Sequence, residues 1–314
     1  MAEQQRSKVR IRVLMEPRHG ARYSEILALA QATERAGFDA FFRSDHLMGV
    51  DPTDRSYRPT DSWTTLGGLA RDTERVRLGT LVTAATYRLP GLLAAIVASV
   101  DEMSGGRIEL GIGTGWYERE HAAFGLPFPP MKERFDRLEE ELAIITGLWL
   151  AGDQNFSFSG RYYRIDDNQS PPQVTQRPHP PVIVGGAGPK RTPAIAARFA
   201  TEFNAALSTV EQARARFEVF AAACEAIGRD PATVRKSGFI PVAIGSTQAE
   251  ADRRAEIVGS SRIRESMLIG PPALLADRIA DLAKVGADTV YLHIFDIHDL
   301  DHIALIGAEV LSQL

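Results

Sequence analysis

The sequence predicts one (β/α)8 barrel domain that takes up the whole chain, residues 1–314. Short runs rich in β-branched residues alternate with helical patterns from end to end, which is typical of strands and helices built around a parallel sheet. Eight such runs can be counted, the number of strands in a barrel of this class. One long insertion, over residues 116–181, interrupts the alternation after the fourth strand.

The first helix shows how each element is recognised. The run over residues 9–15 is rich in Val, and Ser24 is then expected to cap a helix that ends at Gly37. Residues 34–39 lead from this helix into the second strand, and residues 283–288 repeat the arrangement before the last strand. The expected strands cover residues 9–15, 38–42, 75–82, 107–112, 181–184, 201–207, 238–244 and 289–295.

Two further helices are expected, one of them inside the insertion. Residues 92–103 form the helix behind the third strand. The insertion carries an amphipathic helix, whose apolar side consists of Phe135, Leu138, Leu142, Ile145 and Trp149. A hairpin is expected over residues 156–163, before a proline-rich stretch that leads to the fifth strand.

Composition excludes several classes of function. A net charge of −4, from 36 basic and 40 acidic residues, leaves no basic excess for a nucleic acid. The longest apolar run, residues 89–100, is shorter than the roughly 18 residues of a bilayer span, and the N-terminus leads into no apolar secretory core. Cys224 is the single cysteine, so no internal disulfide or cysteine-rich metal site is expected. We therefore expect a cytoplasmic protein with neither nucleic acid nor membrane as a partner.

The carboxyl ends of the expected strands predict where chemistry takes place, because a parallel barrel carries its active site there. Asp45 and His46 follow the second strand. Histidine exchanges a proton near neutral pH, and hydride transfer to a carbonyl, imine or alkene needs a matched proton. A histidine held by structural hydrogen bonds is the alternative interpretation.

Glycine-rich turns follow the fourth and fifth strands. Residues 185–192 link a strand to a helix start, where backbone N–H groups and the helix dipole attract phosphate. The alternative is a plain glycine-rich turn with solvated basic residues. Residues 111–115 also lack the dinucleotide fingerprint; their glycines either let a flat ring approach the backbone or form a tight turn.

A metal site near the last strand is the competing interpretation from another class of protein. Three histidines and three aspartates gather in this stretch: His293, His298, His302, Asp296, Asp299 and Asp301. Such a cluster would suit a metal-dependent barrel hydrolase, but its spacing matches no standard ligand pattern. A solvated loop and helix start explain the same residues, and the metal interpretation is the weaker one.

Taken together, these motifs resemble the luciferase-like flavin oxidoreductase family, and in particular its branch that uses the deazaflavin coenzyme F420. Four segments carry the resemblance: AGFDAFFRSDH at residues 36–46, VRLGTLVT at 76–83, SGGRIELGIGTGW at 104–116 and VIVGGAG at 182–188. They occur in order at the expected strand positions, and the resemblance covers nearly the whole chain.

The resemblance implies a role for each matched residue. Asp45 and His46 would lie beside the deazaflavin ring, with His46 positioning substrate or handling a proton. Leu81–Val82 falls where the family has a non-proline cis peptide that props the ring. The remaining cofactor contacts implied are Thr83, Gly113, Thr114 and Gly115 at the ring and ribityl chain, and Gly185, Gly186, Gly188, Arg191 and Thr192 at the phosphate.

Trp116 departs from the family pattern. A sugar-phosphate dehydrogenase of this family has an acidic proton donor after the Gly-Thr-Gly motif, and Trp116 stands there instead. This substitution disfavours a sugar phosphate and favours an apolar or aromatic substrate pocket, which Tyr87, Phe124 and Phe128 are candidates to join. Packing of the insertion is the alternative role for Trp116, which we count with Asp45 and His46 as a candidate catalytic residue.

The resemblance leaves two cofactors to weigh. The favoured interpretation is a coenzyme F420-dependent oxidoreductase that exchanges a hydride with a small organic substrate. The alternative is an FMN-dependent monooxygenase, which would need oxygen and a flavin reductase as partner. A homodimer is compatible with either.

Overall fold

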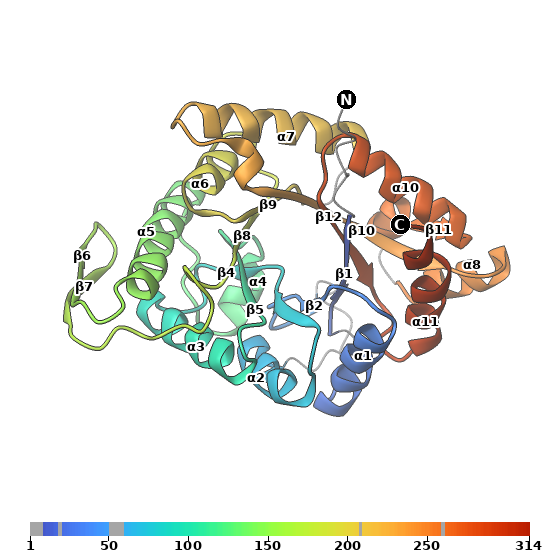
Figure 1. Ribbon diagram of the computed structural model, residues 1–314, viewed down its shortest axis with the longest axis horizontal. Coiled ribbons are helices and arrows are strands. Elements are labelled where there is room, and N and C mark those ends of the chain that lie inside the picture. The colour runs from blue at the N-terminus through green and yellow to red at the C-terminus, as the bar shows by residue number, and fades with distance from the viewer. Residues whose placement is uncertain (1–8, 18–20, 50–59, 207–208, 259–260) are drawn as a thin grey trace, which may run out of the picture.

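A computed structural model describes residues 9–17, 21–49, 60–206, 209–258 and 261–314. Its centre is a closed ring of eight parallel strands: β1 (Arg10–Met15), β2 (Ala40–Arg43), β3 (Arg77–Thr80), β5 (Ile108–Gly113), β8 (Val182–Gly185), β9 (Glu202–Asn204), β10 (Arg235–Ile244) and β12 (Thr289–Ile294). β1 pairs with both β2 and β12, and β9 pairs with β10, which closes the ring. The predicted (β/α)8 barrel is confirmed (Figure 1).

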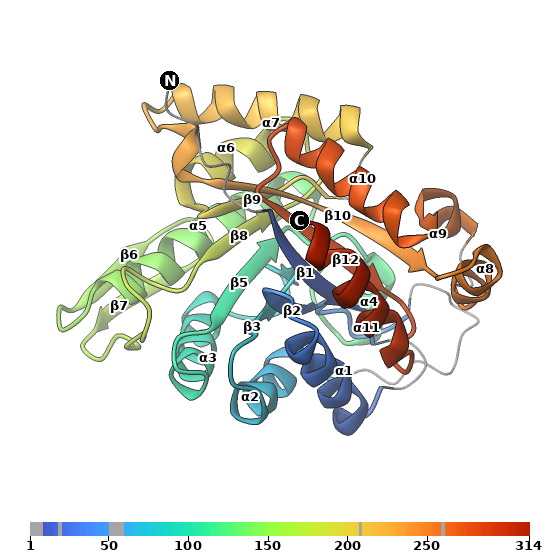
Figure 2. The same ribbon diagram turned by 45° about the vertical axis from the view of Figure 1, so that its right-hand side comes forward.

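Helices surround the strands, as Figures 1 and 2 show. They are α1 (Tyr23–Arg35), α2 (Ser62–Asp72), α3 (Pro90–Met103), α6 (Arg191–Phe199), α7 (Val210–Glu225), α8 (Gln248–Glu256), α9 (Ser261–Ser266), α10 (Pro272–Lys284) and α11 (Leu300–Glu309), with short 3-10 turns at Pro231–Thr233 and Leu311–Gln313. The buried side chains of these helices and the outward side chains of the strands form the main apolar core. None of the helices in the described part of the chain combines the length and apolar character that a bilayer crossing requires.

The insertion lies between β5 and β8, as predicted. It contains α4 (Glu118–Ala123), α5 (Met131–Leu150), and the antiparallel strands β6 (Phe156–Ser159) and β7 (Arg164–Asn168). Leu138, Leu142, Ile145 and Trp149 of α5 are buried, whereas Phe135 is only partly buried. The β6–β7 hairpin projects beyond α5, outside the ring of helices (Figure 2).

Several element boundaries differ from those predicted. α1 begins at Tyr23 with Arg22 in the N-cap position, so Ser24 lies inside the first turn and is not the cap. The expected strand 75–82 ends at Thr80, because a cis peptide between Leu81 and Val82 breaks it before a two-residue strand, β4 (Thr83–Ala84). The hairpin expected over residues 156–163 extends further along the chain, because its second strand is Arg164–Asn168. Of the expected strand 201–207, only Glu202–Asn204 forms a strand, β9, and position 207 lies outside the described residues. β11 (Leu268–Gly270), which pairs with the end of β10, was not predicted.

Charged side chains fill the barrel interior at the amino ends of the strands. Arg12 donates from its two terminal nitrogens to the carboxylate of Glu109, at 2.8 and 3.0 Å, and also to the Tyr291 hydroxyl at 2.9 Å. Tyr291 in turn donates to Glu202 at 2.8 Å. All four side chains are essentially inaccessible to solvent. Because buried charges are stable only when paired and hydrogen-bonded, this network closes the amino end of the barrel and leaves the carboxyl end for the site.

Candidate active site

A bulge after β3 lies against glycines of two neighbouring strands. The Leu81–Val82 peptide is cis, as the family resemblance implied. A Cβ at Gly111 would lie 1.9 Å from the Thr80 carbonyl oxygen, and one at Gly113 would lie 3.1 Å from both the Gly185 carbonyl oxygen and a Val82 methyl group. Only glycine therefore lets the backbone of β3, β5 and β8 come this close together at the carboxyl end of the barrel.

Thr83 and the turn after β5 complete this wall of the site. Thr83 is fully buried; its hydroxyl accepts from the Trp63 indole at 3.1 Å and lies 3.2 Å from the Thr80 hydroxyl. Gly115 has a φ of 74°, which favours glycine, and its carbonyl accepts from Arg134 of α5. Thr114, between Gly113 and Gly115, is partly exposed. These residues shape the backbone of the site, with the hydroxyl of Thr83 already engaged inside the protein.

The turn after β8 folds back on the first turn of α6. Gly186 has a φ of 154°, and a Cβ there would lie 3.3 Å from the Thr192 side chain. A Cβ at Gly188 would lie 2.7 Å from the Thr192 hydroxyl. Thr192 itself is 4% exposed, in the first turn of a nine-residue helix. Gly185, Gly186, Gly188 and Thr192 thus form the predicted strand-to-helix turn, with one hydroxyl and a helix N-terminus at its centre.

Arg191, the first residue of α6, makes its ion pairs with the insertion helix α5. Its guanidinium pairs with Asp136 and with Glu139 of α5, each at 2.7 Å, and lies over the Phe135 ring. Its charge is therefore already balanced by two carboxylates. The structure thus ties Arg191 to the insertion helix.

Asp45 is held in place by its neighbours. Its carboxylate accepts from Ser62, the first residue of α2, at 2.6 Å and from Arg88 at 2.6 Å. Arg88 also pairs with Asp61, the N-cap of α2, at 2.5 Å. Asp45 is only 2% exposed, so it supports the loops after β2 and β4. This geometry suits a positioning residue.

His46 is paired with a carboxylate that the sequence analysis did not identify. Its Nδ1 lies 3.0 Å from Oε2 of Glu120, which is fully buried on α4. Burial alone would lower the pKa of His46, but the hydrogen bond to Glu120 and the charges of Glu16, Glu120 and Asp45 together raise it above its usual value. Burial would raise the pKa of Glu120, yet the contacts with His46, Tyr87 and the Met48 amide lower it. The pair favours an imidazolium beside an ionised carboxylate.

Aromatic side chains flank this pair. Trp116 is 60% exposed, stacks on Tyr117 with ring centroids 5.1 Å apart, and meets His46 edge-on at 5.6 Å. Tyr87 donates to Glu120. The structure therefore brings together Trp116, Tyr87 and His46, as expected for a substrate pocket.

The two phenylalanines predicted to join the pocket behave differently. Phe128 packs against His121, with ring centroids 4.7 Å apart, and under the Arg134 guanidinium at 4.0 Å. His121 Nδ1 donates to the Tyr117 carbonyl at 2.7 Å, and its Nε2 lies 2.6 Å from the Thr86 hydroxyl, so this cluster holds α4 in place. Phe124 is 47% exposed at the end of α4. These contacts tie Phe128 to the His121 cluster, and a place in a substrate pocket stays a prediction for both phenylalanines.

The histidines and aspartates near β12 separate in the fold. His302 is buried and accepts from the Ile244 amide at 3.0 Å, and its burial lowers its pKa to about 4. Asp299 caps α11 and pairs with Arg254 at 2.7 Å. His293 lies in β12, with its Nε2 3.7 Å from the Glu16 carboxylate. Within the described ranges, no three His, Cys, Asp or Glu side chains are placed to hold a metal ion together.

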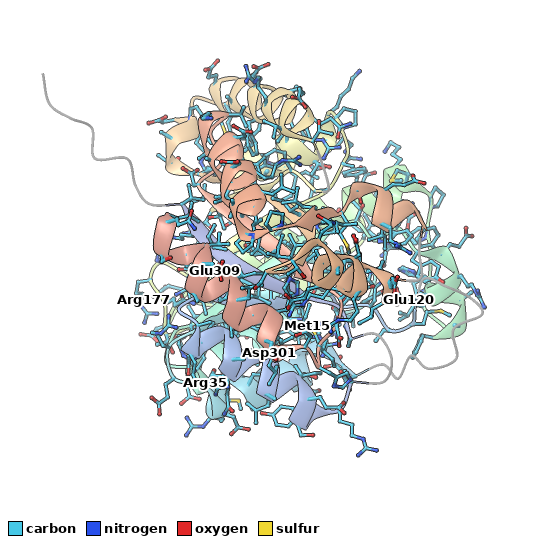
Figure 3. All side chains as sticks on the ribbon, turned by 90° about the vertical axis from the view of Figure 1, so that its right-hand side faces the viewer. Met15, Arg35, Glu120, Arg177, Asp301 and Glu309 are labelled. Atoms are coloured by element: carbon cyan, nitrogen blue, oxygen red, sulfur yellow. The ribbon has the colours of Figure 1, made fainter. Side chains whose placement is uncertain are left out.

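Glu16 and Glu120 are the site residues that sequence reasoning missed. Glu16 follows β1 directly, so its place at a strand end was a signal that could have been used. Glu120 lies four residues after Trp116 inside the insertion, and nothing in its spacing links it to His46, 74 positions away. Figure 3 shows Glu120 on the side of the molecule opposite Arg177, with Met15, the last residue of β1, between them.

Comparison with known proteins identifies the family of this chain. The model of the family described as luciferase-like monooxygenase matches residues 8–262. The chain belongs to this family. The family resemblance drawn from the sequence motifs is thereby confirmed.

The relatives of this chain include proteins named as F420-dependent dehydrogenases and one named as an FMNH(2)-dependent monooxygenase. The chain is 34% identical over 232 residues to the F420-dependent hydroxymycolic acid dehydrogenase of Mycobacterium tuberculosis, a match that covers 73% of this chain and 62% of that protein. It is 40% identical over 184 residues to the F420-dependent glucose-6-phosphate dehydrogenase of Nakamurella multipartita, covering 57% of this chain and 51% of that protein. The FMNH(2)-dependent dimethylsulfone monooxygenase of Pseudomonas putida is 26% identical over 304 residues, covering 84% and 82%.

The chain thus spans about half to three-fifths of the length of the two F420-dependent relatives. Among solved structures, the coenzyme F420 dependent tetrahydromethanopterin reductase from Methanopyrus kandleri superposes with a TM-score of 0.80 at 19% identity, covering 98% of this chain and 99% of that one. That likeness shows the shared fold.

Proposed function

We propose that this protein is a coenzyme F420-dependent oxidoreductase that transfers a hydride between the deazaflavin C5 and a small apolar or aromatic substrate. The observation that carries the proposal is that one barrel mouth combines the glycine-lined bulge at Val82, the Thr192 turn and the His46–Glu120 pair. The F420-dependent relatives support the choice of cofactor.

The residues at the mouth fit the cofactor. Gly111, Gly113 and Gly185 let Val82 lie across the carboxyl ends of β5 and β8, where it offers an apolar platform. The turn from Gly186 to Thr192 has the glycines and helix N-terminus that favour a phosphate group. When bound, coenzyme F420 supplies a carbon that accepts or gives a hydride and that activates oxygen poorly.

His46 supplies the proton chemistry in this proposal. A hydride that enters a carbonyl, imine or alkene, or that leaves the corresponding reduced compound, needs one proton to move with it, and imidazole exchanges protons near neutral pH. Arg88 and Asp45 fix the loop that carries His46. We assign Asp45 a positioning role and His46 the proton transfer.

Trp116 supports the proposed substrate class. An exposed indole beside His46 offers a flat apolar face, and stacking on Tyr117 keeps it in place. An apolar or aromatic alcohol, carbonyl or alkene is therefore the substrate class that we propose.

An FMN-dependent monooxygenase is the second candidate. It is favoured by one specific observation, the match to the dimethylsulfone monooxygenase over 84% of this chain and 82% of that protein. That function would require oxygen and a reductase partner. The metal-dependent hydrolase has no comparable support, because its predicted ligands are dispersed.

Separate titrations with coenzyme F420 and with FMN, followed by quenching of intrinsic fluorescence, test the proposal. We expect F420 to bind at least about tenfold more tightly, a difference of 1.4 kcal/mol. Tighter binding of FMN, or oxygen-dependent turnover, would favour the monooxygenase. Binding of neither would refute both.

A pair of glycine variants tests the location of the cofactor. Gly188→Ala places a Cβ 2.7 Å from the Thr192 hydroxyl, and the resulting shift of the turn is expected to weaken F420 binding about tenfold or more. Gly238→Ala is the matched control, since among the described residues nothing beyond its own chain neighbours lies within 4 Å of the added carbon. Equal affinities in the two variants would place the phosphate elsewhere.

A further inference from the structure

Glu120 joins three loops of the barrel mouth through one buried carboxylate. Its Oε1 accepts from the amides of Leu47 and Met48, the latter at 2.8 Å, and its Oε2 contacts Tyr87 and His46 Nδ1, the latter at 3.0 Å. Leu47, Met48 and His46 follow β2, Tyr87 follows β4, and Glu120 itself follows β5. The side chain is fully buried, so these contacts replace water around the carboxylate.

The hydrogen-bond donors around Glu120 determine whether its carboxyl group is ionised. A backbone amide can only donate, so Leu47 and Met48 both require an acceptor at Oε1. The Tyr87 hydroxyl donates to Oε2. Three donated hydrogen bonds stabilise the ionised form, and a carboxylate in that form has no proton of its own to give.

The ionised carboxylate in turn determines which ring nitrogen of His46 carries a hydrogen. An ionised carboxylate accepts hydrogen bonds only, so the 3.0 Å contact requires His46 Nδ1 to carry a hydrogen in both the neutral and the charged ring. Any proton that the ring exchanges with a substrate must then pass through Nε2. The same carboxylate stabilises the positive charge that the ring acquires when it accepts a proton.

We propose that Glu120 is the positioning residue for His46: it fixes the ring orientation, keeps the proton on Nδ1 and makes Nε2 the atom that accepts or returns the substrate proton. This inference rests on the proposed function for the identity of the reaction, but the assignment of the two ring nitrogens stands on the geometry of the described residues. Neither the sequence motifs nor the relatives assign a role to Glu120.

A purely structural role for Glu120 is the competing interpretation. As a link between three loops, Glu120 would affect stability and leave the protonation behaviour of His46 unchanged. The two roles separate in a measurement on His46 itself. Nitrogen-15 NMR of the full-length protein with labelled histidine reports the protonation of each ring nitrogen, and His46→Asn identifies the His46 signals among the seven histidines.

Wild type and Glu120→Gln are titrated from pH 5 to 9, with Glu118→Gln as the matched control. Glu118 lies on the same helix, is exposed, and receives the same substitution. We expect the neutral His46 ring of wild type to carry its hydrogen on Nδ1. In Glu120→Gln we expect the pKa of His46 to fall by about one unit or more, because the opposite charge is lost and the burial remains. Glu118→Gln is expected to match wild type.

Two results would overturn the inference. One is a wild-type spectrum with the neutral ring protonated on Nε2, which needs no variant and so stands even if Glu120→Gln does not fold. The other is an unchanged pKa of His46 in folded Glu120→Gln. Where turnover is measurable, the limb of the pH–rate profile that belongs to His46 is expected to move by the same amount as the NMR titration.

The NMR measurement uses neither cofactor nor substrate, so it fails independently of the proposed function. F420 binding without the expected titration would leave the proposed function standing and remove Glu120 from it. The expected titration without F420 binding would keep the His46–Glu120 pair and redirect the search for its cofactor.

Discussion

Glu141 of α5 is a carboxyl group buried without compensation. It is fully inaccessible to solvent, and neither of its oxygens has a hydrogen-bond partner among the described residues. Burial raises its pKa well above the usual value, an effect that the positive charge of Arg88 opposes only in part. The folded protein therefore holds a proton on Glu141 that the unfolded chain releases in mildly acidic solution.

The consequence for stability has a definite sign. Because the folded state binds the extra proton, the free energy of unfolding falls as the pH rises from the unfolded pKa of 4.5 towards the raised folded pKa. The slope is about 1.4 kcal/mol for each pH unit. At pH 6.5, two units above the unfolded pKa of 4.5, the burial of Glu141 lowers the free energy of unfolding by about 2.7 kcal/mol, as long as Glu141 stays protonated in the folded state.

Glu141→Met tests this reasoning. Methionine keeps the length of the side chain and removes the ionisable group, so we expect it to raise the free energy of unfolding at pH 6.5 by about 2–4 kcal/mol and to have a much smaller effect near pH 4.5. Glu141→Gln also removes the titration but leaves polar atoms buried, so it should remove the same pH-dependent component while stabilising less than methionine.

Urea unfolding of the three proteins at pH 4.5, 5.5 and 6.5 provides the assay. The difference between methionine variant and wild type is expected to grow by about 1.0 kcal/mol from pH 4.5 to 5.5, where the unfolded carboxyl is still partly protonated, and by about 1.3 kcal/mol from pH 5.5 to 6.5. A difference that stays constant with pH would refute the argument, because Glu141 would then have the same protonation in the folded and unfolded states.

The remaining predictions concern the barrel interior and the mouth. Glu109→Gln is expected to cost about 3–5 kcal/mol in urea unfolding at pH 7, since Arg12 keeps Asp39 and Glu202 as partners but the buried network loses the carboxylate that Arg12 and Arg77 share; a cost under about 1 kcal/mol would contradict this. Arg12 and Arg77 lower the pKa of Glu109 to about 2 against its burial, so this part of the wild-type stability is present above pH 4.5 and is lost as the pH falls towards 2, which an acid titration of unfolding measures. Trp116→Ala is expected to raise KM about tenfold for an apolar substrate and to change kcat little, because the indole binds substrate without touching the reacting atoms; an unchanged KM would remove it from the pocket. Arg191→Ala is expected to change F420 affinity by less than about threefold, because Asp136 and Glu139 already balance its charge; a loss above about tenfold would return it to the phosphate site.

The fold was largely predictable because each strand and helix carries a local signal. The glycines that end α1 and α10, Gly37 and Gly286, both have positive φ and precede a strand in the same way, as the repeated pattern predicted. Boundaries were less predictable. Arg22 occupies the N-cap position of α1 without a side-chain capping hydrogen bond. The usual preference for Ser or Asp at an N-cap therefore could not identify this helix start.

The site was predictable where one strand end forms it and unpredictable where distant segments meet. Gly113 and Gly185 end their strands and Thr192 lies in the first turn of the helix that follows β8, so local sequence identifies the turns to which they belong. Glu120 acts through His46, and that contact depends on how α4 folds back over the mouth, which no local pattern encodes. The same holds for Arg191, whose partners lie on the insertion helix α5.

The two ends of the barrel depend on each other through strand register. Arg12 and Tyr291 are register partners in β1 and β12, and two residues further Leu14 is paired with His293 at the mouth. Because side chains alternate along a strand, a slip of one residue would move Arg12 out of the interior and turn the mouth residues of β1 away from the site. The buried charges at the amino end therefore specify the register that aligns the residues at the carboxyl end, so substitutions there are expected to act on stability first and on the site only through it.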